Sequence, residues 1–137
     1  MSQPTRKSPP NTLSLRHAFE VEQARREAER FAREEADRRQ QEEDLGRSEQ
    51  LYDALISDPA FLAAHDLSVD WRRYTVILES PDFRIRAYFE AGEASVSVGD
   101  KRNVAVAATP SPLKREDVDS VADALRVVAQ FLADEIP

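Results

Sequence analysis

Hydrophobic and polar positions follow a helical spacing in the first third of the chain. From Leu13 to Leu45 there is no glycine or proline, and alanine, glutamate, arginine and glutamine dominate. These residues are strong helix formers, and glutamates precede arginines by four residues, as in Glu22–Arg26, which stabilises a helix. The pattern predicts a charged helical arm over residues 13–47. Gly46 is expected to end or break this helix.

The next apolar positions indicate a short helical region before the first strand. Ser48 can cap a new helix that carries the apolar residues Leu51 and Leu55. Pro59 cannot lie inside that helix, so we expect it to begin a further turn.

After Asp70 the apolar residues recur at every second position, which is typical of strands. Tyr74, Val76 and Leu78 form the first alternating run, and Phe83 to Phe89 form the clearest one. A third run covers 94–98, and a fourth strand is expected around Val104 and Val106. Short connections separate these runs, so the sequence predicts a four-stranded antiparallel meander.

The last segment has the pattern of an amphipathic helix. Ser111 is expected to cap it, with Pro112 at its first position. Its predicted apolar stripe should cover one face of the sheet, with Leu125 buried. The stripe comprises Val118, Val121, Ala122, Leu125, Val128, Ala129, Leu132 and Ile136.

These patterns together predict an α+β fold in three parts. Residues 1–12 contain three prolines among polar residues and are expected to be a disordered tail. Residues 13–47 form the charged helical arm. Residues 48–137 form a small α+β domain in which a helix, the four-stranded meander and the C-terminal helix follow one another.

Composition and charge narrow the classes of function. The net charge is −7, which opposes binding to a phosphate backbone, so nucleic acid is not the expected partner. No apolar run approaches the roughly 20 residues that span a bilayer, and no signal-peptide pattern is present. We therefore expect a cytoplasmic protein without a membrane association. Heavy use of arginine and alanine is typical of a GC-rich bacterial genome.

The sequence offers no pattern for catalysis or for a cofactor. There is no cysteine, and the two histidines, His17 and His65, lack a second metal ligand at helical or hairpin spacing. The three glycines form no phosphate-binding loop, and no serine lies in a nucleophile motif. We therefore expect neither enzyme activity nor a bound metal or cofactor.

The outer face of the predicted sheet is one candidate interaction surface. Because Phe83, Ile85, Ala87 and Phe89 should face the core, the residues between them should face outward. Arginine, tyrosine and isoleucine together are typical of contact surfaces, although a plain solvent-exposed face has a similar composition. Both interpretations stay open. The candidate residues are Arg73, Ile77, Arg84, Arg86 and Tyr88.

The arm is a second candidate surface. Val21, Ala24, Ala28 and Phe31 occupy the a and d positions of about two heptads, after which charged residues take those positions. A coiled coil needs about three to four heptads to be assigned with certainty, and alanine gives a thin seam. A weak homodimer, an arm packed on the sheet and a solvated single helix are the three alternatives.

We therefore expect a non-catalytic adaptor or regulator that binds a protein partner. In size and charge alone, the chain resembles bacterial secretion chaperones, small immunity proteins and antitoxins. The alternative is a nucleic-acid or anionic-ligand binding module that uses the arginines and the tyrosine of the sheet face.

Overall fold

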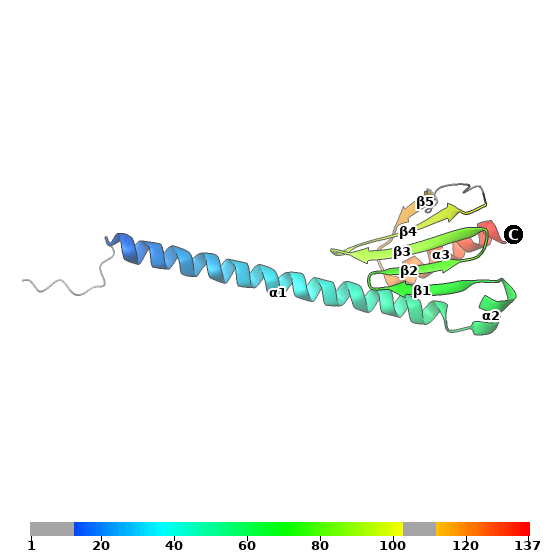
Figure 1. Ribbon diagram of the computed structural model, residues 1–137, viewed down its shortest axis with the longest axis horizontal. Coiled ribbons are helices and arrows are strands. Elements are labelled where there is room, and N and C mark those ends of the chain that lie inside the picture. The colour runs from blue at the N-terminus through cyan, green and yellow to red at the C-terminus, as the bar shows by residue number, and fades with distance from the viewer. Residues whose placement is uncertain (1–12, 103–111) are drawn as a thin grey trace, which may run out of the picture. The chain divides into compact units, whose positions relative to one another are not determined.

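A computed structural model describes residues 13–102 and 112–137 of the chain. Three helices and five strands make up this part, and the predicted α+β fold is confirmed (Figure 1). The predicted tail at residues 1–12 and the strand expected around Val104 and Val106 lie outside the described residues. The elements are α1 (Leu15–Leu55), α2 (Pro59–Ala64), β1 (Ser68–Arg72), β2 (Thr75–Glu79), β3 (Phe83–Glu90), β4 (Glu93–Asp100), β5 (Pro112–Asp117) and α3 (Val121–Glu135).

Helix α1 is continuous through Gly46, so the predicted break there is wrong. A Cβ atom at Gly46 would meet no other atom within 4 Å, which places this residue on an open side of the helix. A glycine inside a helix costs only about 1 kcal/mol relative to alanine. Buried Ser48 and Leu51 lie just beyond it and outweigh that cost. The chain divides into two compact units between Arg39 and Gln40.

The sheet has five antiparallel strands in sequence order rather than the expected four. Strand β1 precedes the first predicted strand. Strand β5 takes the place of the expected start of the last helix, and Ser120 rather than Ser111 caps α3 through a 3.0 Å hydrogen bond from the Asp123 amide. Pro112 begins an edge strand, where proline is tolerated because a missing amide hydrogen leaves no partner unsatisfied.

One hydrophobic core lies on a single face of the sheet. The alternate residues of β3 and β4, among them Phe89 and Val96, pack there against α3 and against Leu51 of α1. Helix α3 packs against β3 and β4 and is seen behind the sheet in Figure 1. The opposite face carries no helix among the described elements and is called the open face below.

The buried side of α3 differs from the predicted stripe. Leu125 is 39% exposed, so the expectation that it is buried is wrong, and Ala122 and Ala129 are exposed as well. Because α3 begins later than predicted and presents a rotated stripe, its buried residues are Ala124, Val127, Val128 and Phe131. No described helix has the length and apolar character needed to cross a membrane.

Candidate functional site

Two tight turns lie at one end of the sheet, and both contact α1. The β1–β2 turn contains Arg73 with φ 62°, and the β3–β4 turn contains Ala91 and Gly92 with φ 55° and 81°. Positive φ at the central residues gives a two-residue hairpin the twist that matches its strands. Arg73 therefore lies at a turn rather than on the open face, and its guanidinium stands 5.4 Å from the Tyr74 ring centroid.

One face of α1 contacts both turns through residues spaced four apart. The Asp44 carboxylate is 1% exposed and accepts hydrogen bonds from Gln40 at 2.9 Å, from Arg47 at 2.7 Å and from the Gly92 amide at 3.4 Å. Four residues later, the Ser48 hydroxyl lies 2.5 Å from the Arg73 carbonyl oxygen. These polar contacts satisfy buried groups and fix the two hairpins against the helix.

The indole of Trp71 completes this junction from the side of β1. Its Nε1 donates to the Ser48 hydroxyl at 3.0 Å and to the Arg73 carbonyl at 2.8 Å. Its ring stacks on Tyr52 of α1, with centroids 5.5 Å apart. The C-terminal part of α1, the β1–β2 turn and the edge strand β1 therefore pack together at this junction.

The strand register defines the rows of the open face. One row crosses all five strands, and a second lies beside it toward the turns described above. The first row runs Asp70, Ile77, Arg86, Ser97 and Arg115, and the second runs Arg72, Thr75, Tyr88, Ser95 and Asp117. Of the predicted surface residues, the structure thus brings Ile77, Arg84, Arg86 and Tyr88 together on one face.

Ile77 is less accessible than the sequence suggested. It is 8% exposed and yet lies outside the main core, because it points to the open face. Its cross-strand neighbours are Asp70 and Arg86. The longer polar side chains around Ile77 cover it, so the middle of the charged open face contains a buried apolar residue.

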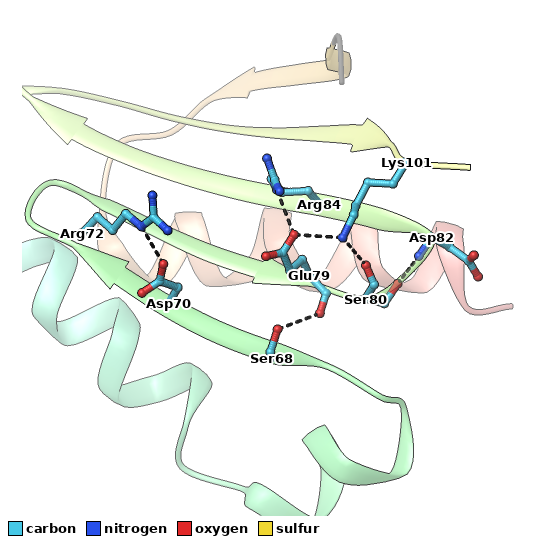
Figure 2. A network of polar contacts seen from close by, with 8 residues as sticks. All are labelled: Ser68, Asp70, Arg72, Glu79, Ser80, Asp82, Arg84 and Lys101. Atoms are coloured by element: carbon cyan, nitrogen blue, oxygen red, sulfur yellow. Dashed lines mark hydrogen bonds and ion pairs between the residues drawn. The ribbon is translucent and has the colours of Figure 1, made fainter. Parts of the chain in front are cut away.

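Most of the charged side chains on this face are paired. Figure 2 shows the Glu79 carboxylate between Arg84 and Lys101, at 2.9 and 3.1 Å, and Asp70 beside Arg72 at 2.6 Å. Burial alone would raise the pKa of Glu79, but the hydrogen bonds from Arg84 and Lys101 outweigh it and hold this pKa below its ordinary value.

Arg86 is the exception in the middle of the face. Its half-buried side chain makes no hydrogen bond or ion pair to any residue in the described ranges. Next to it on β3, Tyr88 is 39% exposed and its hydroxyl donates to Glu90, which raises the pKa of Tyr88. The face therefore presents an unpaired guanidinium next to an exposed aromatic ring and above a buried isoleucine.

A shallow hollow of about 340 Å³ adjoins this group. Tyr88 and Ser95 line it together with Arg115 and Asp117 of β5, which face each other at 3.8 Å. Sequence reasoning missed Arg115, because four successive charged residues gave β5 no apolar alternation. The small side chains Ser95 and Ser97 on β4 leave room between the larger ones on β3 and β5.

The described side chains do not assemble a metal centre. Within residues 13–102 and 112–137, no three His, Asp or Glu side chains gather in a way that could hold a metal ion. The His65 ring packs against the Phe61 ring, with centroids 4.7 Å apart. His17 lies in the first turn of α1, where its amide donates a hydrogen bond to the Ser14 hydroxyl.

The arm residues named from the sequence all lie on α1 with exposed side chains. Val21, Ala24, Ala28 and Phe31 are exposed, and none of them contributes to the hydrophobic core. The ion pairs along this helix include the expected Glu22–Arg26 pair and, in addition, a Glu22–Arg25 pair three residues apart.

Comparison with known proteins adds no assignment. Neither a protein-family model, nor a curated protein, nor a solved structure matched this chain. The features that bear on function are therefore the geometry of the open face and of α1.

Proposed function

We propose that this chain is a non-catalytic, cytoplasmic adaptor or regulator that binds a protein partner through the open face of its sheet. The observation that carries the proposal is the Arg86 guanidinium, which pairs with no residue in the described part of the chain, beside exposed Tyr88 in the centre of that face. Arginine and tyrosine dominate the energetics of protein interfaces, above all near their centres.

The chemistry of the face indicates what the partner should offer. A half-buried guanidinium without a carboxylate of its own can accept one from outside, and an arginine–carboxylate pair is often bidentate. The exposed Tyr88 ring can contact an apolar side chain next to that carboxylate, while the hollow beyond it is lined by polar and charged residues such as Glu93, Arg115 and Asp117. The expected partner segment therefore carries an aspartate or glutamate near an apolar residue.

Nucleic acid is a weaker candidate for the same face. Asp70, Glu79 and Asp117 lie among its arginines and pair with three of them. A phosphate backbone would meet these carboxylates as well as the basic groups, and the whole chain carries a net charge of −7. A partner with a few well-placed charges fits this mixed surface better than a uniform polyanion.

The proposal is tested by quantitative affinity capture from the native host. The tagged full chain is compared with an Arg86→Ala/Tyr88→Ala variant and with the control Arg126→Ala, which changes an exposed residue of α3. We expect at least one protein whose recovery falls about tenfold or more with the double variant only, since hot-spot truncations cost above 1 kcal/mol.

The same proteins are titrated with duplex and single-stranded oligonucleotides at two salt concentrations. Oligonucleotide binding that falls steeply with salt and disappears in the double variant would replace the proposal with the nucleic-acid alternative. Equal recovery of every captured protein by all three baits would reject the open face as the binding surface.

A further inference from the structure

The first unit of the chain exposes large apolar side chains that its own residues do not cover. Within the helical residues 15–39, Val21 is 54% exposed and Phe31 is 66% exposed, and Leu15 and Phe19 are exposed on another side of the helix. Single exposed apolar residues are common on proteins. Here, however, they lie with Ala24 and Ala28 in one line along a helix, at the a and d positions of two heptads.

The charged residues beside this line have a regular order. With Val21 at position a, the g positions are Glu20, Glu27 and Glu34, and the e positions include Arg25 and Arg39. In a parallel, in-register pair of helices, each g residue faces the e residue five positions later on the other helix. Glu20 would then face Arg25, and Glu34 would face Arg39, with opposite charges in both cases.

An antiparallel pair would not have this complementarity. It brings g positions opposite g positions and e positions opposite e positions, so glutamates would face glutamates, and Arg25 would face an arginine or an alanine rather than a glutamate. Within the described residues, the side chains of Glu20, Glu34 and Arg39 form no ion pair in the single chain. These three charges therefore need not give up a bond to meet a second helix, whereas Arg25 already pairs with Glu22 and Glu29 and would have to share its guanidinium.

We propose that residues 15–39 form a parallel, in-register two-stranded coiled coil with a second copy of this chain. Val21, Ala24, Ala28 and Phe31 form its seam, and the Glu20–Arg25 and Glu34–Arg39 pairs set its direction. This inference is independent of the open face, because it uses neither the sheet nor the residues of the second unit.

The seam also predicts that the dimer is weak. Alanine at two of the four apolar positions buries little surface, and Glu35 and Arg38, which follow in the seam, already pair with each other at 2.8 Å. Association should therefore depend on protein concentration and weaken at high salt, because exposed ion pairs are screened.

Sedimentation equilibrium of the full chain tests the self-association. With rising concentration the mean mass should increase from 15.5 kDa toward twice that value. A Val21→Glu/Phe31→Glu variant should raise the dissociation constant at least about tenfold, whereas the matched Leu15→Glu/Phe19→Glu variant, which lies off the seam, should not. A monomer at every concentration, or equal effects of both variants, would overturn the proposal.

Single cysteines test direction and register in this cysteine-free chain. In a parallel in-register dimer, His17→Cys and Ala24→Cys, both at d positions, should each form a disulfide-linked dimer, whereas Phe19→Cys on the far side should not. An antiparallel pair cannot bring both d positions against themselves, so cross-linking of at most one of the two would reject the parallel arrangement.

A charge exchange tests the flanking pairs. Glu34→Arg should raise the dissociation constant about threefold to tenfold, because it places like charges opposite each other on both sides of the dimer. The double exchange Glu34→Arg/Arg39→Glu should restore dimerisation. Failure of the double exchange to recover more than the single change would contradict the proposed register.

Discussion

Replacing Asp44 with alanine should destabilise the junction between α1 and the β3–β4 turn. The Asp44 carboxylate is almost fully buried and accepts hydrogen bonds from Gln40, Arg47 and the Gly92 amide. Alanine would leave the Gly92 amide without this acceptor. It would also remove the ion pair of Arg47, whose buried Nε atom has no hydrogen-bond partner among the described residues.

The size of the loss follows from the burial of the two charged groups. Breaking a buried ion pair by removing one partner costs about 3–5 kcal/mol. The Arg47 side chain retains 21% exposure and lies 3.9 Å from Glu43, so water and that carboxylate can partly replace Asp44. We therefore expect Asp44→Ala to lower the free energy of unfolding by about 2–3 kcal/mol.

Urea unfolding of the full chain measures this loss, with two controls. Asp53→Ala removes an exposed carboxylate from the same helix and should change stability by less than about 0.5 kcal/mol. Asp44→Asn keeps an acceptor oxygen and should lose less than the alanine variant. Hydrogen exchange at the Gly92 amide should also become faster in Asp44→Ala. A loss no greater than that of Asp53→Ala would refute the role assigned to the junction.

Two further predictions concern the core and the charges of the open face. Phe131→Ala should cost about 3–5 kcal/mol in a denaturant melt, whereas Leu125→Ala should cost clearly less, because only Phe131 is buried; equal losses would mean that α3 is rotated from the orientation described. Glu79→Gln should destabilise the protein by about 1 kcal/mol at pH 7 through its bonds to Arg84 and Lys101. Because folding lowers the pKa of Glu79, that difference should be complete above about pH 4.5, the ordinary pKa of the group, and should fade as the pH drops through the folded value. A difference that stays constant down to acid pH would exclude the charged network as its source.

The sequence predicted strands β2, β3 and β4 and missed β1 and β5. Strand β3 alternates apolar and polar residues without exception up to Phe89, so the sequence could predict which of its side chains face the core. Strand β5 has four charged residues in succession and belongs to the sheet through its backbone pairing with β4. Such pairing leaves no trace in hydrophobic periodicity, which reports burial rather than hydrogen bonding.

The candidate site was predictable only in part for a similar reason. The alternation around Ile85 was sufficient to place Arg84, Arg86 and Tyr88 on one face. The difference between paired Arg84 and unpaired Arg86 depends on the strand register, which brings Glu79 opposite Arg84. Register is set by turns and by packing of the whole sheet, so single-strand patterns do not determine it.

The open face as a protein-binding surface is the central claim, and the affinity of a captured partner tests it most directly. The dissociation constant of the purified partner is measured for the wild-type chain, Arg86→Ala, Tyr88→Ala and Arg126→Ala, with unfolding curves alongside. We predict that Arg86→Ala and Tyr88→Ala each weaken binding by about 1–4 kcal/mol at unchanged stability, while Arg126→Ala binds like wild type. Equal dissociation constants for all four proteins would contradict the claim.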